Sequence, residues 1–502
     1  MAWPQLYMEG VMSSPPKRAV VIGAGLGGLG VALRLAAQGW QVDIHEQAAT
    51  AGGKMNRWTA EGYRFDTGPS LITMPWVFEE LFAAAGSSLS NHLTLHRVEP
   101  IASYHYDDGT HFVHTGCLPD WLPTVRKLEG GDASGFLAFM ALGAKLFNVS
   151  QATFFKRSPF EPPDRDSGRA LRDMPLRRGW GNYARTLQHY IRSPHLRQLF
   201  NRYMTYVGSS PYQAPATLAV IPFVEYAFGG WHVQGGLYRI VEALLALGEE
   251  RGVRCHLNSA VTGITRKQQR ITGVQLVNGE VVQADAVIMN GDASWTDTLL
   301  GRPGAQPLPE AKRSLSGLIF LFGLKSTRPD QPHHQVFFSA DYQTEFRQLF
   351  DERRFPDDPT VYINMPSRSD RSMVPETGEV MFVMANAPAN EQDAWDGAMI
   401  AEARARVFNR LSRSGFPDIR ADVAVSNVWT PKNIAQRYAM PGGAIYGQVS
   451  HGWRGAFLRP ANRSKRWPGL YYVGGSTHPG GGTPTVLMSA DITARLVVQH
   501  ES

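Results

Sequence analysis

The chain has 502 residues, of which 43% are hydrophobic and 19% are charged. This composition is typical of a globular protein and excludes a disordered, collagen-like or coiled-coil chain. Because one hydrophobic core stops growing near ~250–300 residues, we expect two or three structural units. The formal net charge of +6 suits an anionic partner such as a membrane surface. No pattern of basic and aromatic residues indicates a nucleic-acid partner.

Cysteine and histidine patterns exclude several kinds of site. The two cysteines, Cys117 and Cys255, are too few for a disulfide framework or a cysteine-ligated metal, and they suit a reducing cytoplasm. None of the 15 histidines lies in a metal-binding pattern such as HExxH, so we expect no metal site. The pair His333-His334 is expected in a solvated loop.

The first residues and the most apolar segments bear on membrane attachment. Residues 1–17 lack a continuous apolar region, so we expect a flexible leader rather than a signal peptide. The apolar segments 135–149 and 216–228 are interrupted by Lys145 and Glu225, respectively. We therefore expect no membrane-spanning helix, and a membrane-bound form would lie on the surface.

Hydrophobic periodicity predicts secondary structure along the whole chain. The expected elements, in chain order, are a strand over 19–23, a helix over 28–38, a strand over 41–46, a mostly helical stretch over 70–230, a helix over 235–253, short strands over 254–290 with a hairpin at Asn278-Gly279, strands near 318–325, 361–366 and 379–386, a helix over 400–413, a strand over 470–475 and a helix over 484–498.

The first strand, helix and strand carry a GxGxxG pattern at Gly23, Gly25 and Gly28. The first glycine allows the turn, the second lets the backbone approach a pyrophosphate, and the third allows the helix to pack on the strand. Glu46 ends the second strand, where a carboxylate accepts hydrogen bonds from ribose hydroxyls and would repel a 2′-phosphate. The pattern predicts a dinucleotide site that prefers FAD or NAD over NADP.

Two further runs resemble a known family. Gly52-Gly53-Lys54 follows the second strand, and Phe65-Asp66-Thr67-Gly68-Pro69-Ser70 follows soon after. Both runs are similar to those of flavoproteins in the amine oxidase–phytoene desaturase superfamily. The resemblance implies that Gly53 and Lys54 lie along the phosphates of FAD, and that Gly68 approaches the flavin.

Residues 457–490 resemble the closing signature of bacterial-type phytoene desaturases and acyclic carotenoid desaturases. The resemblance places Gly475 beside the flavin and points the helix-terminal amides of Thr485 and Val486 at the ring. A helix N-terminus there suits the negative charge that a reduced flavin carries. Amine oxidases instead usually show an A-G-E triplet where this chain has Gly475-Ser476-Thr477.

The middle of the chain is also similar to these desaturases, and the resemblance spans residues 18–498. Residues 284–292 match an A-D-x-V-x-x-N-x-D run, which implies that Asp292 lies near the flavin. Val261 stands where the family contacts adenine through the backbone. Ala461 replaces a histidine that is frequent in phytoene desaturases, so the substrate stays open.

Two residues are catalytic candidates. Glu225 interrupts an apolar segment near the expected substrate path, and His478 lies inside the run beside the flavin. A conjugated chain stabilises a developing allylic cation itself, so a weak base or water would suffice. This chemistry explains why no sharp acid–base constellation is visible.

The expected fold is α/β, with a Rossmann-type FAD-binding domain that has a parallel sheet, helices and a β-meander. A mixed α+β substrate domain with a helical, membrane-associating part completes it. The expected segments are a flexible leader over 1–17, FAD-binding parts over 18–70, 231–300 and 441–502, a mostly helical substrate and membrane-associating region over 71–230, and the substrate-domain sheet and helices over 301–440.

The resemblance implies an FAD-dependent desaturase that introduces double bonds into an acyclic carotenoid precursor of phytoene type or a later C40 or C30 intermediate. The expected partners are a long apolar isoprenoid, an anionic membrane surface at the cytoplasmic face, and an electron acceptor such as a quinone or dioxygen. Two alternatives stay open: a flavin-dependent carotenoid isomerase or saturase, and a non-enzymatic prenyl-lipid-binding protein of the GDP-dissociation-inhibitor type.

Overall fold

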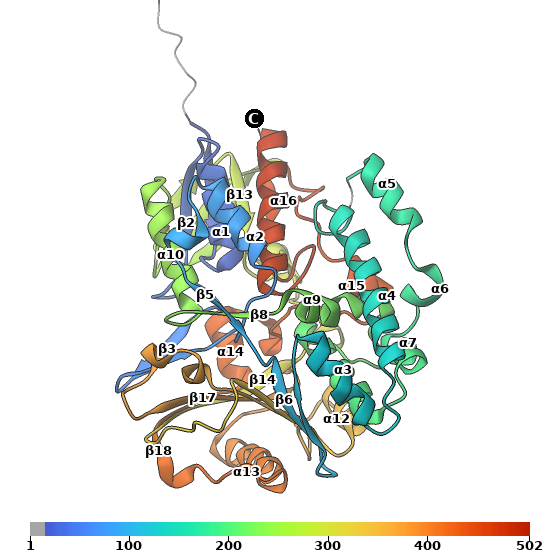
Figure 1. The fold of residues 1–502 in the computed structure, drawn as a ribbon. Helices are drawn as coiled ribbons and strands as arrows, with labels where there is room; N and C mark the ends of the chain where they lie inside the picture. The colour runs from blue at the N-terminus through green and yellow to red at the C-terminus, as the bar shows by residue number, and fades with distance from the viewer. Residues whose placement is uncertain (1–15, 160, 502) are drawn as a thin grey trace, which may run out of the picture.

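A computed structural model describes residues 16–159 and 161–501 (Figure 1). Most of the predicted leader therefore lies outside the described residues. Figure 1 shows a unit built on a parallel sheet at the top, a large sheet at the bottom, and a group of helices on the right.

The upper unit contains a five-stranded sheet in which all the strands are parallel. Its spatial order is β19 (Leu470–Tyr472), β13 (Ala286–Met289), β1 (Arg18–Ile22), β2 (Gln41–His45) and β9 (Arg254–His256). The strands come from the beginning, the middle and the end of the chain, as expected for a doubly wound nucleotide-binding unit.

The two faces of this sheet pack against different layers. Ala19 and Val21 point toward helices, whereas Val20 and Val287 point toward the meander, because successive side chains alternate across a strand. The helices are α1 (Leu26–Ala36), α2 (Pro75–Ala84), α10 (Tyr238–Glu250) and α16 (Thr483–Glu501), and the meander strands are β10 (Val261–Lys267), β11 (Arg270–Leu276) and β12 (Val281–Gln283). The predicted turn at Asn278-Gly279 joins β11 to β12, with Gly279 at φ +85°.

The lower unit is a seven-stranded mixed sheet, antiparallel except for the pairing of β15 with β6. Its order is β18 (Val423–Trp429), β14 (Ser316–Leu324), β17 (Glu379–Ala387), β16 (Val361–Asn364), β15 (His334–Phe337), β6 (Ala102–His105) and β7 (His111–His114). α13 (Gly397–Arg413) covers the face that carries Phe320 and Phe322. The opposite face packs Ile319 and Leu321 against β4 and α14. The bounds of the elements around it are β3 (Arg57–Ala60), β4 (Tyr63–Asp66), α12 (Tyr342–Phe350) and α14 (Pro431–Tyr438).

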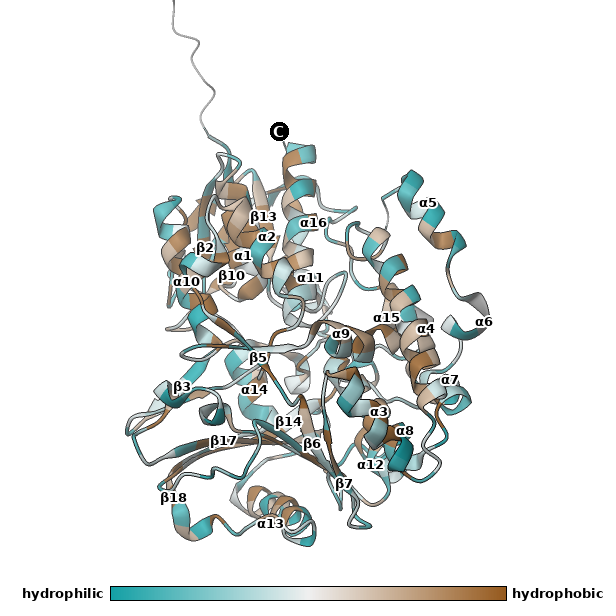
Figure 2. Ribbon diagram, viewed as in Figure 1, coloured by the Kyte–Doolittle hydropathy of each residue, from teal (hydrophilic) through white to brown (hydrophobic). Residues whose placement is uncertain are grey.

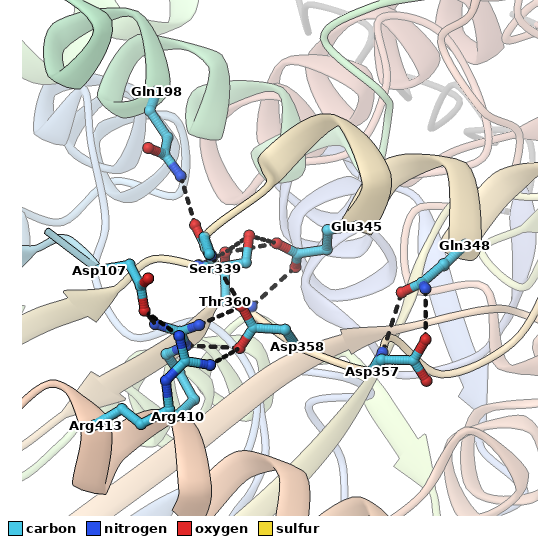
Figure 3. Close-up of polar contacts among 11 residues, drawn as sticks. Asp107, Gln198, Ser339, Glu345, Gln348, Asp357, Asp358, Thr360, Arg410 and Arg413 are labelled. Carbon is cyan, nitrogen blue, oxygen red and sulfur yellow. Dashed lines mark hydrogen bonds and ion pairs between the residues drawn. The ribbon is translucent and has the colours of Figure 1, made fainter.

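A polar network fixes α13 and α12 to the edge of this sheet (Figure 3). Arg410 is fully buried and donates to Asp107 and Asp358. The carboxylate of Glu345 accepts from the Ser339 hydroxyl, and from the hydroxyl and backbone N–H of Thr360. Burial raises the pKa of Glu345 to about 7. These contacts satisfy the buried groups, so the network holds the sheet together.

The helical region packs an aromatic core against the β6, β7 and β15 strands of the lower sheet. Its helices are α3 (Leu118–Lys127), α4 (Ala133–Ala152), α5 (Arg165–Arg172), α6 (Leu176–Gly179), α7 (Tyr183–Tyr190), α8 (Pro194–Arg202) and α9 (Val220–Phe228). The remaining short elements are β5 (Leu95–Val98), which pairs with β8 (Gly230–Val233), α11 (Thr296–Leu299) and α15 (Gly452–Phe457).

In the described part of the chain, α4 is the one helix that is long and apolar enough to cross a membrane, with a mean hydropathy of 1.3. The expectation of no such helix, based on Lys145, was wrong by this criterion. A buried core helix passes the same test, and Phe136, Phe139 and Leu146 of α4 are buried in the helical core. The α/β class with its two sheets is confirmed, whereas membrane association stays a prediction.

Candidate functional site

The GxGxxG turn has the geometry of a dinucleotide cradle. Gly23 has φ +98°, and a Cβ on Gly28 would lie 2.2 Å from the carbonyl oxygen of Gly23. Gly25 is the N-cap of α1, so the first amides of the helix face the space above the turn. The residues that the sequence predicted for phosphate binding therefore lie together at the carboxyl end of β1.

The second glycine pair reaches the same turn. Gly52 bridges to Gly25, and a Cβ on Gly53 would lie 3.2 Å from the Cα of Gly25. A Cβ on Gly68 would lie 1.8 Å from the carbonyl oxygen of Lys54. The backbones of three separate runs thus pack closely around the cradle. Side chains in place of these glycines would fill it.

Glu46 lies at the carboxyl end of β2, nearly buried. Its two carboxylate oxygens accept the backbone N–H groups of Ala24 at 2.8 Å and Ala48 at 2.9 Å. Each oxygen keeps a second lone pair, so the carboxylate can still accept ribose hydroxyls. The N–H of Ser259 donates to the backbone oxygen of Glu46, which brings Val261 on β10 to the same end of the cradle.

Asn290 joins the cradle to the closing run of the chain. Its amide donates to the carbonyl oxygen of Gly23 at 3.0 Å. A Cβ placed on Gly27 or on Gly474 would lie 2.6 or 3.0 Å from its side-chain oxygen. Sequence reasoning did not select Asn290, although it belongs to the run that ends at Asp292. Asn290 connects segments that are distant in sequence, and a local sequence pattern does not show such contacts.

The closing run places α16 beside α1. A Cβ on Gly27 would lie 3.1 Å from the Cγ1 of Val486 in the first turn of α16, and the Thr485 hydroxyl donates to the carbonyl oxygen of Gly482. The N-termini of two helices therefore converge on one space, which favours negative charge there. Gly474 adopts the left-handed conformation, with φ +108°, whereas Gly475 does not.

Asp292 supplies a direct test of whether a flavin dinucleotide fits. Its Oδ1 accepts from the amide and hydroxyl of Ser294, while its buried Oδ2 has no hydrogen-bond partner among the described residues. A Cβ on Gly447 would lie 3.0 Å from this Oδ2. An orphaned carboxylate oxygen next to a glycine cradle suits the hydroxyl and N–H groups of a bound FAD.

The expectation that Lys54 lies along the phosphates stays a prediction. Its ammonium donates to the carbonyl oxygen of Ile445 at 2.6 Å, on the side of the seven-stranded sheet. Desolvation lowers the pKa of Lys54 to about 8, although Asp292 acts in the opposite direction. This ammonium therefore lies beside Asp292, at the end of the cradle where the resemblance places the flavin ring.

Arg459 is a second functional residue that sequence reasoning missed. It is buried, and its guanidinium donates to the carbonyl oxygens of Gly475 and Gln448 and to the Ser450 hydroxyl. Burial lowers the pKa of Arg459 to about 10, and Asp292 opposes the change. Arg459 thus fixes the backbone at Gly475. The sequence shows Arg459 in the "F-L-R-P" run, but it does not show the contact of Arg459 with Gly475.

Glu225 is buried on α9. Its two oxygens accept the hydroxyls of Tyr203 at 2.8 Å and Tyr206 at 2.7 Å. A carboxylate held by two tyrosine hydroxyls is a poor general base, because its lone pairs are engaged. The structure therefore gives Glu225 a place in a polar cluster rather than a free catalytic position.

His478 is buried within the closing run. Its Nε2 lies 2.7 Å from the carbonyl oxygen of Phe154, which it can reach as a donor. Desolvation lowers the pKa of His478 to about 4, so the ring is neutral at pH 7. The contact fastens the closing run to the end of α4, which is a structural role.

The pair His333-His334 is not solvated, and that expectation was wrong. Both rings are buried at the start of β15, where His334 Nδ1 lies 2.8 Å from the Tyr362 hydroxyl. Within the described residues, no group of three His, Cys, Asp or Glu side chains could hold a metal ion. The site is thus a dinucleotide cradle with buried charged groups at its ring end.

Comparison with known proteins agrees with this geometry. Residues 26–498 match the family described as flavin containing amine oxidoreductase. The zeta-carotene-forming phytoene desaturase of Myxococcus xanthus is 34% identical over 490 residues, which cover 97% of this chain and 95% of that protein. The hydroxyneurosporene desaturase of Rubrivivax gelatinosus is also 34% identical, over 96% of this chain and 93% of that protein. The 4,4'-diapolycopene oxygenase of a Methylomonas species is 32% identical, over 97% and 99%.

Solved structures share the fold at much lower identity. Wild-type putrescine oxidase bound to putrescine matches with a TM-score of 0.62 and 14% identity, over 96% of this chain and 99% of that one. A fatty acid isomerase from P. acnes matches with a TM-score of 0.60 and 14% identity, over 97% and 99%. At these identities the likeness concerns the architecture.

Proposed function

Since this chain belongs to the family of flavin containing amine oxidoreductases, we propose that it is an FAD-dependent desaturase of an acyclic carotenoid. The observation that carries the proposal is full-length similarity to carotenoid desaturases at 34% identity. The predicted family and the predicted flavin cofactor are confirmed. The chain is therefore an oxidoreductase, and the non-enzymatic lipid-binding alternative has no support.

The residues of the chain prepare the site in three ways. FAD, when bound, supplies the acceptor for the hydrogen and electrons that leave as a carbon–carbon single bond becomes double. Asn290 and Arg459 donate hydrogen bonds to the carbonyl oxygens of Gly23 and Gly475 and so fix the positions of these glycine turns. The N-terminus of α1 favours the negative charge of the phosphates, and we expect the N-terminus of α16 to favour negative charge at the ring end. An apolar polyene offers no polar group to bind, so its binding depends on apolar surroundings. The buried aromatic side chains of the helical region exclude water.

The electrons must then leave the protein. The chain contains one GxGxxG run, at Gly23 to Gly28, and the structure has one cradle built on it. The proposal therefore includes no second dinucleotide-binding unit for a nicotinamide cofactor. The proposed electron acceptor is a quinone or dioxygen. Measurement of quinone reduction with and without oxygen separates the two.

A panel of acyclic carotenoids in liposomes tests the proposed activity. The purified flavoprotein is incubated with C40 and C30 precursors that differ in their number of double bonds, and the pigments are separated by chromatography. We expect at least one product with a longer conjugated chain. Recovery of every precursor unchanged, with flavin bound, would contradict the proposal.

Oxidation of a terminal carbon is a second candidate. The relatives include 4,4'-diapolycopene oxygenase at 32% identity and 4,4'-diaponeurosporene oxygenase at 31%. Pigment chromatography separates this outcome from desaturation, because an oxygenated product gains mass and polarity. Isomerase or saturase activity would appear in the same assay as a product with an equal or smaller number of double bonds.

We further propose that the enzyme docks on the cytoplasmic face of the membrane, because its substrate is insoluble in water. Leu171 on α5, Trp180 after α6 and Leu458 after α15 are each about half exposed, at 50–51%. The Trp180 ring lies 6.2 Å from that of Phe457, the residue that precedes Leu458 in the chain. Figure 2 shows that α5 carries a hydrophobic turn between hydrophilic ones. The basic residues exposed on α5 are Arg165, Arg169 and Arg172.

Flotation with liposomes tests this docking surface. Trp180→Ser and Leu458→Ser each remove one apolar side chain, whose insertion stabilises binding by roughly 1.5–3 kcal/mol. We expect each change to weaken binding about tenfold or more. Val277→Ser is the control, since Val277 is 65% exposed on the meander, in a different unit. Equal loss in the control, or no flotation of the wild type with any lipid, would refute the surface.

A further inference from the structure

The buried pair His333-His334 takes no part in the cradle described above. The two side chains are 6% and 2% exposed, and their ring centroids lie 4.4 Å apart with 46° between the ring planes. In each ring Nδ1 faces a hydroxyl group, whereas Nε2 is buried and has no hydrogen-bond partner in the described part of the chain. Native proteins rarely leave buried nitrogens unpartnered, so the pair calls for a role beyond packing.

Hydrogen bonds connect His334 to the ring end of the cradle. Its Nδ1 lies 2.8 Å from the hydroxyl of Tyr362, and that hydroxyl lies 2.7 Å from the hydroxyl of Ser70. Tyr362 packs in the same cluster as Ile445, whose carbonyl oxygen accepts the ammonium of Lys54. Ser70 and Tyr362 are only half-buried, which leaves this end of the hydrogen-bonded chain accessible.

The other ring connects to the surface. His333 Nδ1 lies 2.7 Å from the hydroxyl of Ser369, and Ser369 is exposed. The groups that join the site to solvent are therefore, in order, Ser70, Tyr362, His334, His333 and Ser369. Hydrogen bonds make every contact in this series except the one between the two rings, where each ring has its unpartnered Nε2.

The surroundings of His334 oppose a proton on its ring. Desolvation lowers its pKa well below the usual value, and the charges of His333, Arg202 and His232 act in the same direction. The ring is therefore neutral at pH 7 and has one acceptor nitrogen and one donor nitrogen. A proton that reached it would be released readily.

The surroundings of His333 are more favourable to a proton. Desolvation lowers its pKa to about 3, and His232 adds to this effect, but Asn364 and Asp370 oppose it. The side-chain oxygen of Asn364 is itself buried without a hydrogen-bond partner among the described residues, so it can accept the extra N–H of a protonated ring. A proton is thus more stable on His333 than on His334, which favours movement outward.

We propose that His334 and His333 carry the proton released by desaturation from the site to solvent. This inference rests on the proposed desaturase function and names the proton path of that site. When a hydride leaves one carbon of the substrate for FAD, the C–H bond of the neighbouring carbon breaks and its electron pair forms the double bond. The proton goes to the Ser70 oxygen, while the Ser70 hydroxyl proton moves to Tyr362. The Tyr362 proton moves to His334 Nδ1.

The second half of the proton path leads outward. His334 gives its Nε2 proton to Nε2 of His333, and the Nδ1 proton of His333 leaves to water at Ser369. One proton enters at Ser70 and one leaves at Ser369, so the charge of the protein is unchanged, and reorientation of the rings restores the first tautomers. An allylic cation is a strong acid, so groups of low pKa are sufficient acceptors.

Two variants of His333 test the proton path. His333→Ala removes the ring nearest the surface and leaves space for free imidazole, whereas His333→Phe fills this space with a ring that has no nitrogen. In the liposome assay we expect kcat to fall roughly tenfold or more in both, with FAD content and KM unchanged. Added imidazole should restore part of kcat in His333→Ala alone. The fall should be larger in D₂O, because proton release then limits the rate.

His105→Phe is the matched control. His105 also has a buried Nε2 without a partner in the part of the chain that the structure describes, and desolvation lowers its pKa to about 4. Its ring stacks on Phe337 at 4.5 Å, on the face that α13 covers, whereas Tyr362 packs on the opposite face. This variant should keep the wild-type kcat with and without imidazole.

Two further measurements decide the matter if the His333 variants do not fold. Tyr362→Phe removes only a hydroxyl and should also lower kcat roughly tenfold or more. Nitrogen NMR of the wild type, labelled in histidine, should show His334 protonated at Nε2 and free to accept at Nδ1.

Several results would overturn the inference. They are an unchanged kcat in His333→Ala or Tyr362→Phe, and a loss in His333→Ala that imidazole does not restore, which would show a structural role. Absence of product with the wild type would contradict the proposed desaturation, and the tautomers would then decide the proton path alone. His334 protonated at Nδ1 would overturn it, because Tyr362 could not donate to that nitrogen.

Discussion

At the scale of single residues, we predict that Glu46 binds the ribose of FAD. Glu46→Ala removes hydrogen bonds from a carboxylate, each worth roughly 1.5–3 kcal/mol when charge-assisted. We expect FAD affinity to fall by roughly tenfold or more, as measured by flavin fluorescence on titration of the apoprotein.

Glu46→Gln is the matched control, because its one carbonyl oxygen keeps one of the two contacts to the backbone N–H groups of Ala24 and Ala48 and the side chain keeps its length. It should retain more affinity than Glu46→Ala. Undiminished affinity in both variants would show that the ribose lies elsewhere.

Glu345 makes stability depend on pH. Its pKa is raised from 4.5 to about 7 by burial, so between these values the folded protein keeps a proton that the unfolded chain has lost. Stability is therefore highest below the unfolded pKa and falls as pH rises toward 7, by roughly 3 kcal/mol in total. Glu345→Gln should remove this fall when urea unfolding is compared at pH 5, 6, 7 and 8. Parallel profiles for wild type and variant would contradict the assignment.

The glycines of the GxGxxG turn have the conformation and packing that the sequence predicted, because local backbone geometry requires them. Gly23 and Gly28 must be glycine because of their φ angle and close packing, and a short pattern reveals that need. Asn290 and Arg459 act through partners hundreds or tens of residues away, so no local pattern reveals their contacts. His334 was misplaced because histidine in a short run resembles loop composition.

At the scale of elements, we predict that the strand and helix of the closing run set the reactivity of the flavin rather than its retention. A Cβ on Gly475 would lie 3.5 Å from Gly481 and 4.0 Å from Val486, so an alanine fits and a larger side chain must enter the site. We expect Gly475→Leu to keep most of its flavin and to lose most desaturation. Gly475→Ala, the control, should keep both. A Leu variant with unchanged turnover would place this run on the wrong side of FAD.

Helices long enough to show a hydrophobic period could be predicted from the sequence. Short strands that pair with distant strands could not. The helix expected over 235–253 is α10, and the closing helix expected over 484–498 is α16. By contrast, β6 and β7 lie in a stretch expected to be mostly helical, and they extend the seven-stranded sheet. Four-residue strands have too little periodicity to be recognised, and their pairing with β15 is a long-range contact.

At the scale of the whole molecule, the FAD-binding unit is assembled from three distant stretches, and its closing strand β19 pairs with β13. The substrate sheet and the helical region lie between these stretches in sequence. This arrangement accounts for a single site in which a bound flavin meets an apolar chain. It also predicts that the flavin is reduced and the substrate is oxidised in the same turnover.

Anaerobic single turnover measures that coupling most directly. The flavoprotein is mixed without oxygen or quinone with the acyclic carotenoid that gave product in the liposome assay, and the absorption of flavin and pigment is followed together. The account predicts that oxidised flavin disappears in step with a pigment that has gained one double bond, in equal amounts. A pigment that isomerises while the flavin stays oxidised would contradict it.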